Sequence, residues 1–310
     1  MTTRPEPRDT RCDQGLGAIM SERRQLINLA YRMLGSLADA EDVVQETYAR
    51  WYAMSGAQRK AIASPGGWLW KVASRICLDL LGSARVRRES YVGEWLPEPV
   101  PDQAEWEAGQ AGGSAADPAD RVTLDESINM AFLVVLESMT PAERVAFILH
   151  DVFRYPFAEV AEIVGRTPVA CRQLASSARR RLRASPTPAT PAARRASLVR
   201  DFKQAWEAKD IEALIGLLDP DATGLSDGGG LVAAAPRTEG GEEIARWLIA
   251  VIGLAPDLTL LERTVNGQPG LVVQQAGATR TVVAFDFAGD RIKRLWAVRN
   301  PEKLRPWTAP

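Results

Sequence analysis

Residues 157–183 of this 310-residue chain read FAEVAEIVGRTPVACRQLASSARRRLR. A short apolar periodicity over the first eight of these residues predicts a helix, and Gly165 supplies the turn that follows it. Thr167 is a suitable N-cap, and Pro168 a suitable first residue, for a second helix that ends at Arg183. Two helices joined by so short a turn predict a helix-turn-helix.

The second helix of this motif is polar and basic on one side. Polar residues near its start suit base edges in a major groove, and arginines near its end suit phosphates. A helical hairpin with a solvated basic face is the alternative interpretation. The turn residues and the basic second helix both fit a DNA-binding motif. We therefore expect DNA binding by this helix, which carries Arg172, Gln173, Ser176, Arg179, Arg180, Arg181 and Arg183.

Two longer helices are predicted upstream. One begins after Ser36 in the pattern of a capping box. One face of this helix is expected to be buried, and another carries acidic side chains. An acidic helix face by itself usually faces solvent and binds no partner. The second begins near Pro65 and passes Leu81, with Lys71 and Arg75 together on its solvated side. Its predicted buried stripe is Leu69, Val72, Ile76 and Leu80, and Arg85, Arg87 and Arg88 follow at its end.

The chain divides at two stretches of linker composition. Residues 92–120 are rich in Pro and Gly, and residues 97–120 carry six acidic and no basic side chains. So long a stretch without periodicity indicates a boundary rather than a loop inside a domain. The prolines of 184–194 disfavour helix. The folded units expected from these boundaries are 16–91, 121–183 and 195–310.

The last unit changes from helical to mixed character. Helical patterns over about 196–209, 211–218 and 241–253 come before strand patterns over 258–265, 271–275, 280–287 and 291–298. Asn266-Gly267 and Gly289-Asp290 suit tight hairpin turns. We therefore predict a multidomain protein with two all-α helical domains followed by an α+β domain whose sheet is mostly antiparallel.

The composition, with 46% hydrophobic and 25% charged residues, is typical of a globular protein. We find no apolar run long enough to span a bilayer and no secretion signal, which predicts a cytoplasmic protein with no membrane partner. Cys12, Cys77 and Cys171 are too widely spaced for a disulfide framework or a CxxC metal site. His150 is the one histidine and is expected to be structural, so we expect no metal and no cofactor.

Two runs of the sequence resemble a known family. LINLAYRMLGSLADAEDVVQETYARWY, followed by WLWKVASRICLDLLGSARVRRE, closely resembles region 2 of extracytoplasmic-function sigma factors. MTPAERVAFILHDVFRYPFAEVAEIVGRTPVACRQLASSARRRL resembles their region 4. The last unit is similar to SnoaL-like cone domains. WLPEP at 95–99, DGGG at 227–230 and NPEKL at 300–304 resemble signatures of the sigma-factor subgroup that carries such a fused domain.

This resemblance implies a non-catalytic RNA polymerase sigma factor that directs promoter-specific transcription initiation. The implied partners are bacterial core RNA polymerase, through its β′ clamp and β subunit, and promoter DNA. The implied units are polymerase and −10 binding at 16–91, an acidic linker at 92–120, −35 binding at 121–183, a Pro-rich linker at 184–194, and a SnoaL-like regulatory domain at 195–310.

The same resemblance assigns roles to residues. Those implied to dock on the β′ clamp are Asp39, Glu41, Asp42, Gln45 and Glu46. Those implied to contact −10 DNA are Lys71, Arg75, Arg85, Arg87 and Arg88. The helix implied to read the −35 element carries Arg172, Gln173, Ser176 and Arg179.

In this subgroup the fused domain is thought to replace a separate anti-sigma factor. We therefore expect a regulatory contact between the acidic linker and the fused domain, with Trp95 as its apolar anchor. Leu231 stands where the subgroup usually has a basic residue, which leaves a charge-assisted contact there open. The residues expected to form the regulatory contact are Trp95, Leu96, Pro97, Asp227, Gly228, Gly229, Gly230, Asn300 and Pro301.

Two other functional classes are weighed against this interpretation. A SnoaL-like enzyme would need acid and base groups in the last unit. That unit contains no histidine, and its candidate carboxylates are Asp201, Glu207, Asp227 and Asp286. A ligand-sensing helix-turn-helix regulator would leave the pattern over 36–88 unexplained and would bind duplex DNA without polymerase. A small-molecule ligand in an apolar cone cavity is compatible with a sigma factor as well.

Overall fold

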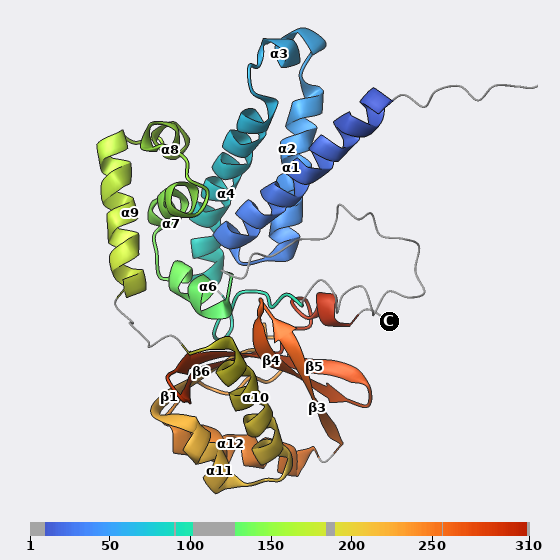
Figure 1. The fold of residues 1–310 in the computed structure, drawn as a ribbon, viewed down its shortest axis with the longest axis vertical. Helices are drawn as coiled ribbons and strands as arrows, with labels where there is room; N and C mark the ends of the chain where they lie inside the picture. The colour runs from blue at the N-terminus through green and yellow to red at the C-terminus, as the bar shows by residue number, and fades with distance from the viewer. Residues whose placement is uncertain (1–9, 90, 102–127, 184–189, 256, 309–310) are drawn as a thin grey trace, which may run out of the picture.

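The computed structural model describes residues 10–89, 91–101, 128–183, 190–255 and 257–308, except for the side chains of 10–21 and 84–89. Figure 1 shows a helical part and a separate sheet-containing part, with the chain from residue 91 to 101 lying between them. We call residues 10–89 region 2, residues 128–183 region 4, residues 91–101 the linker strand, and residues 190–308 the cone domain.

Region 2 consists of four helices: α1 (Thr10–Leu34), α2 (Leu37–Ala53), α3 (Gly56–Ala61) and α4 (Pro65–Glu89). The hydroxyl of Ser36 caps α2 by accepting a hydrogen bond from the Asp39 amide at 3.2 Å. The predicted stripe of α4 is partly wrong, because this helix packs against α1 and α2 and also against two helices of region 4. Val72 and Leu80 are only half-buried, whereas Ala73, Cys77 and Leu81 are buried.

Region 4 contains α6 (Met130–Glu137), α7 (Pro141–Phe147), a π-helical turn (Ile148–Val152), α8 (Phe157–Val164) and α9 (Pro168–Arg183). The predicted helix-turn-helix is confirmed. Gly165 ends α8 at a φ of 68°, and the Thr167 hydroxyl accepts a hydrogen bond from the Ala170 amide at 3.2 Å. Regions 2 and 4 share one hydrophobic core.

The cone domain begins with α10 (Ala192–Glu207) and α11 (Ile211–Leu217) and contains α12 (Gly241–Leu254) after its first two strands. Its six strands are β1 (Leu218–Asp227), β2 (Thr238–Glu239), β3 (Leu258–Val265), β4 (Gln268–Gln275), β5 (Ala278–Ala288) and β6 (Arg291–Val298). A short 3₁₀ turn, Arg305–Trp307, follows them. The sheet order is β2-β1-β6-β5-β4-β3, and the neighbours are antiparallel except for the parallel pair β1 and β6.

The predicted hairpin at Asn266-Gly267 is present, with φ values of 50° and 69° that suit a tight two-residue turn. This turn makes Val265 pair directly with Gln268, so β4 starts at 268 rather than at the predicted 271. The strand β1 was not predicted. The fold class of two helical units followed by an α+β domain is confirmed.

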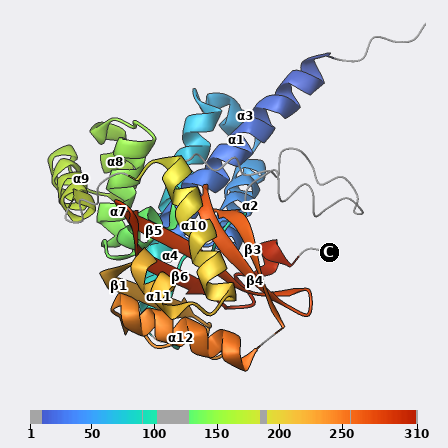
Figure 2. The same ribbon diagram turned by 60° about the horizontal axis from the view of Figure 1, so that its bottom comes forward.

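Both faces of the sheet are covered. Helices α10, α11 and α12 lie on one face (Figure 2), where Phe202, Trp206 and Phe285 belong to one core. On the other face, Leu96 of the linker strand and Met130 of α6 pack with sheet residues such as Trp296. The outer face of the sheet is therefore the surface on which the linker strand and region 4 both rest.

Candidate functional site on the helical regions and the linker strand

The outward face of α9 carries most of the residues predicted to read DNA. In Figure 1, α9 forms an outer edge of the helical part. The side chains of Arg172, Gln173, Ser176 and Arg180 are exposed there. Arg179 differs, because its guanidinium forms a bidentate pair with the Asp151 carboxylate at 2.7 and 3.1 Å. In this arrangement the Arg179 guanidinium is held by an ion pair within region 4.

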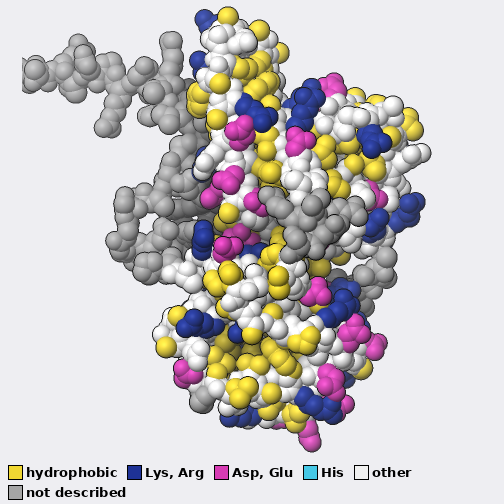
Figure 3. Space-filling view, turned by 180° about the vertical axis from the view of Figure 1, so that it is seen from behind, with side chains coloured by type: hydrophobic (Ala, Val, Ile, Leu, Met, Phe, Trp, Pro, Cys, Tyr) yellow, Lys and Arg dark blue, Asp and Glu magenta, His cyan; other side chains and the backbone are white. Residues whose placement is uncertain are grey.

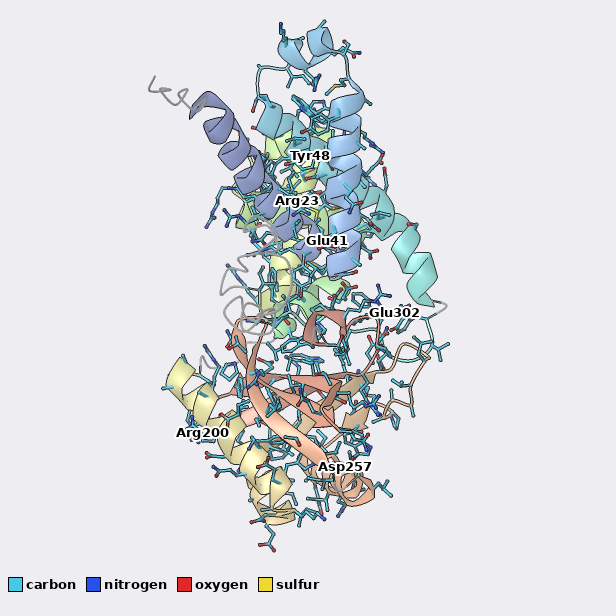
Figure 4. All side chains as sticks on the ribbon, turned by 90° about the vertical axis from the view of Figure 1, so that its right-hand side faces the viewer. Arg23, Glu41, Tyr48, Arg200, Asp257 and Glu302 are labelled. Atoms are coloured by element: carbon cyan, nitrogen blue, oxygen red, sulfur yellow. The ribbon has the colours of Figure 1, made fainter. Side chains whose placement is uncertain are left out.

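The acidic face of α2 is directed to solvent. Asp39 is half-buried, and Glu41, Asp42, Gln45 and Glu46 are exposed. Figure 4 labels Glu41 on this helix, along the side of the helical part. Glu46 pairs with Arg50 one turn later at 2.7 Å. The residues predicted to dock on polymerase thus share one accessible surface of negative charge.

Two cations on the basic face of α4 contact region 4 at an exposed position. The Lys71 ammonium lies 2.5 Å from a carboxylate oxygen of Glu162 on α8. Arg75 donates to the backbone carbonyl of the same residue at 2.9 Å. The hydrogen bond and charge of Lys71 lower the pKa of Glu162. Two of the cations predicted to contact −10 DNA are therefore bound to the first helix of the helix-turn-helix. The other three, Arg85, Arg87 and Arg88, lie outside the described side chains.

A buried arginine and an aromatic cluster also join regions 2 and 4. Arg144 on α7 is 2% exposed; it donates to the Met33 carbonyl of α1 at 2.8 Å and pairs with Glu137 at 2.7 Å. Burial lowers the pKa of Arg144 to about 9. The Trp70 ring of α4 packs against Phe153 and Tyr155, with centroid distances of 4.9 and 5.6 Å. The contact between the two regions is thus a packed interface beyond the exposed ion pair.

The linker strand is bound to the cone domain through one buried carboxylate. Asp227 is fully buried at the end of β1. One of its oxygens accepts hydrogen bonds from the Tyr91 hydroxyl at 2.6 Å and the Gly229 amide at 2.9 Å. The other accepts from the Leu96 amide at 3.0 Å and the Lys303 ammonium at 2.7 Å. Every donor but Gly229 comes from a distant part of the chain.

Lys303 and Asn300 complete this cluster, which we call the Asp227 network (Tyr91, Leu96, Asp227, Asn300 and Lys303). Lys303 is 9% exposed and also donates to the Leu96 carbonyl at 2.5 Å. Its ammonium lies 4.2 Å from the Trp95 ring centroid and 5.3 Å from that of Tyr91. The side-chain carboxamide of Asn300 donates a hydrogen bond to the Tyr91 hydroxyl at 3.0 Å. Burial raises the pKa of Tyr91, which keeps that hydroxyl protonated as a donor.

The three glycines after Asp227 permit close approach. A Cβ on Gly228 would lie 2.1 Å from the Val232 carbonyl oxygen, and one on Gly229 would lie 2.5 Å from the Asn300 carboxamide. Gly229 and Gly230 also have φ values of 66° and 70°, which disfavour other residues. A Cβ on Gly230 would lie 3.0 Å from Val92 of the linker strand.

The apolar anchor of the linker strand is Leu96 rather than the predicted Trp95. Leu96 is 2% exposed and packs into the outer face of the sheet. Trp95 is only half-buried; a Cβ on Gly35, in the turn between α1 and α2, would lie 2.9 Å from its ring and 3.5 Å from the buried Pro97. Consecutive residues of an extended chain point to opposite sides, so only one of Trp95 and Leu96 can face the sheet.

The same linker strand is hydrogen-bonded to region 2. The Glu98 amide donates to the Gly35 carbonyl at 2.8 Å, and its carboxylate accepts from the Leu37 amide at the start of α2, also at 2.8 Å. The Tyr31 hydroxyl donates to the Glu98 carbonyl at 2.7 Å and accepts from the Asn266 amide at 2.7 Å. Region 2, the linker strand and the β3–β4 turn therefore share one buried polar cluster.

Several of these residues were not singled out from the sequence: Tyr31, Tyr91, Glu98, Glu162, Asn266 and Lys303. Glu98 and Lys303 stand inside the quoted WLPEP and NPEKL motifs, which was the available signal. Asn266 was read only as a turn residue, although its side chain reaches region 2. Pro301, which was predicted to belong to the contact, is exposed. Figure 4 places its neighbour Glu302 at the junction between the helical part and the cone domain.

Two negative findings apply to the part of the chain that the structure describes. Within it, no helix is both long and apolar enough to cross a bilayer. Nor do three or more His, Cys, Asp or Glu side chains come together there in a way that could bind a metal ion. His150, expected to be structural, stacks on Phe157 with a centroid distance of 3.7 Å.

Comparison with known proteins agrees with this geometry. Residues 18–87 match the family model for sigma-70 region 2, and residues 129–182 match that for sigma-70 region 4. The chain is 38% identical to the ECF RNA polymerase sigma factor SigJ of Mycobacterium tuberculosis, over 91% of this chain and 90% of that protein. It is 36% identical to the probable ECF RNA polymerase sigma factor SigI of the same species, over 93% and 94%.

A solved structure is similar over nearly the whole chain. The crystal structure of the Mycobacterium tuberculosis extracytoplasmic function sigma factor SigJ superimposes with a TM-score of 0.73 at 32% identity, covering 94% of this chain and 98% of that one. Sequence, domain order and fold thus agree along the chain. The protein belongs to the extracytoplasmic-function family of RNA polymerase sigma factors, which bind core RNA polymerase and promoter DNA to initiate transcription.

Proposed function

We propose that this sigma factor is restrained in cis by its cone domain, which keeps regions 2 and 4 in a closed arrangement. In this proposal the acidic face of α2 docks on the β′ clamp, and region 4 contacts the β subunit. The basic face of α4 contacts the −10 element and the exposed face of α9 reads the −35 element. The proposed boundaries of the functional units are 16–91, 92–120, 121–183, 184–194 and 195–310. The protein acts in the cytoplasm, where RNA polymerase works.

The observation that carries this proposal is the contact of Glu162 with Lys71 and Arg75. Promoter elements centred near −10 and −35 are about 25 base pairs apart, which corresponds to roughly 85 Å of duplex at 3.4 Å per base pair. Helix α8, next to the −35 reader, instead lies within hydrogen-bond distance of the −10 reader. Simultaneous binding of both elements therefore requires regions 2 and 4 to separate.

The cone domain opposes that separation from two sides. Its Asp227 network binds the linker strand, which is hydrogen-bonded to region 2, and its sheet packs on α6 of region 4. Because the three parts belong to one chain, each contact forms at an effective concentration in the millimolar range. Weak individual contacts are sufficient to favour the closed state under these conditions.

Regulation is better supported than catalysis in the cone domain. Of the four carboxylates considered from the sequence, Asp227 is bound in its network, Glu207 pairs with Lys203 and Asp286 pairs with Arg294. Asp201 is exposed on α10. In the described structure none of the four lines the cavity of the cone domain, where an acid and a base would have to act on a substrate.

The test is transcription by core RNA polymerase with the full chain and two charge variants. Glu162→Lys places a third cation beside Lys71 and Arg75 and should open the closed state, giving more transcript from a responsive promoter. Glu212→Lys, at an exposed residue of α11 in the cone domain, makes the same charge change away from that contact. If both variants give equal transcript, the Glu162 contact does not restrain the factor. Core-polymerase binding is measured separately for each chain.

A further inference from the structure

The cone domain contains a cavity of about 730 Å³ between its helices and the inner face of its sheet. This volume lies within the range of small-molecule sites. Most of the lining is apolar, with the aromatic rings of Phe202 and Trp206 on α10 and Trp247 on α12. In Figure 3, hydrophobic side chains gather on the part of the molecule that contains this domain.

One polar group in the cavity wall has no partner. Ser226 on β1 is 3% exposed and lines the cavity, and its hydroxyl has no hydrogen-bond partner within the described structure. A buried hydroxyl without a partner is unfavourable, because desolvation is not compensated. Ser226 pairs across the sheet with Ala297, and Arg299 follows two residues later on the same side of that chain. All three residues line the cavity.

The charged residues that line the cavity have one sign. Arg280 and Arg299 are among its lining residues, whereas the described lining contains no carboxylate and no imidazole. The Arg299 guanidinium donates to the Ala233 carbonyl. A guanidinium has five N–H donors, so this bond leaves others for a ligand. Arginine is suited to binding carboxylates through paired hydrogen bonds.

From these features we propose that the cavity binds an amphiphilic small acid. Its apolar ring or acyl body lies among Phe202, Trp206 and Trp247, its acidic group is bound by Arg299, and Ser226 donates to an oxygen atom of the ligand. An apolar molecule can be buried in this cavity without Arg299. Because Arg299 binds only the acidic group, we expect an acid to bind more tightly than a neutral molecule of the same shape.

The residues that line the cavity and those of the Asp227 network are neighbours in the sequence. Ser226 directly precedes Asp227, and the loop that continues through Gly228 and Gly230 contributes Val232 to the cavity wall. A ligand that moves this loop changes the contact between Gly230 and the linker strand. This second step, ligand control of the closed state, rests on the proposed function, whereas the binding site does not.

The test uses the purified full chain without polymerase and two fluorescent molecules, 1-pyrenebutyrate and its neutral analogue 1-pyrenebutanol. We expect saturable binding of one pyrenebutyrate per chain and weaker binding of the alcohol. Arg299→Met keeps an apolar stem and should weaken binding of the acid roughly tenfold, with little effect on the alcohol. Val251→Trp fills the cavity and should weaken both by more than roughly tenfold.

The matched control is Glu212→Trp, which adds the same indole on the exposed side of α11, outside the cavity. Circular dichroism and thermal unfolding show whether each variant is folded, and Arg299→Met keeps the test decisive if Val251→Trp does not fold. Absence of saturable binding to the wild-type chain would overturn the proposal. So would equal binding by the Val251 and Glu212 variants, or an acid affinity that Arg299→Met leaves unchanged. These outcomes do not affect the Glu162 test, so the two proposals fail separately.

Discussion

Replacing Asp227 by Asn should release the linker strand from the cone domain. The amide keeps the size of the side chain but removes the charge that balances Lys303, which is 9% exposed. One carboxylate oxygen is also replaced by an NH₂ group, which donates, whereas all four present partners of the carboxylate are themselves donors. Removing one partner of a buried ion pair costs about 3–5 kcal/mol.

Hydrogen exchange measures this cost at the site itself, because the Leu96 amide donates to Asp227. At about 1.4 kcal/mol per factor of ten, exchange of the linker strand should become roughly a hundred to a few thousand times faster. Asp290→Asn is the matched control, since its carboxylate is 80% exposed and pairs with Arg194 on the surface. That variant should change exchange by less than about tenfold. A change below about threefold in Asp227→Asn would refute the view that this carboxylate fastens the linker strand.

Three further predictions concern the same junction. Leu96→Ala should lower the free energy of unfolding in urea by about 2–5 kcal/mol, and Trp95→Ala should lower it by less. Trp95→Ala should also alter promoter activity without unfolding the protein. Equal losses of unfolding free energy in the two variants would contradict Leu96 as the anchor. Burial raises the pKa of Glu98 to about 7 in the folded protein. The stability that the protonated side chain contributes is therefore complete below about pH 4.5 and is lost as the pH rises through 7. Glu98→Gln should flatten this fall in the free energy of unfolding between about pH 4.5 and 7, as measured by urea unfolding at several pH values. Gly229→Ala should cost clearly more thermal stability than Gly277→Ala, because both glycines have positive φ but only the first has a neighbouring side chain within 4 Å of an added Cβ; equal melting temperatures would exclude the steric argument.

The features that could be predicted from the sequence depend on residues close together in the chain. The helix-turn-helix follows from Gly165, Thr167 and Pro168, and the hairpin follows from Asn266-Gly267. The strand β1 was missed because its sequence, LDPDATGLSD, contains residues that are unfavourable in strands. Pairing with β6, more than sixty residues later, makes it a strand.

The surfaces implied by the family resemblance lie on exposed faces of α2 and α9, but the contacts that close the molecule could not be derived from periodicity. Lys71 and Glu162 are 91 positions apart, and Asp227 and Lys303 are 76 apart. Helical periodicity indicates which side of α4 is polar but not that Glu162 of α8 binds two cations on that side. Trp95 was the predicted anchor, whereas Leu96 is the residue that packs against the sheet.

Asn300 and Lys303 are synthesised long after both helical regions, because they follow those regions in the chain. The Asp227 network needs these two residues, so it cannot form until translation of the cone domain is nearly complete. At about 5–20 residues per second, synthesis from Ala192 to Lys303 takes roughly 6–22 s, and both helical regions have been made before it starts. Under the proposed function, a nascent chain therefore passes through an interval in which regions 2 and 4 lack the restraint of the cone domain. Polymerase that binds the chain in this interval competes with closure by the cone domain rather than reversing it.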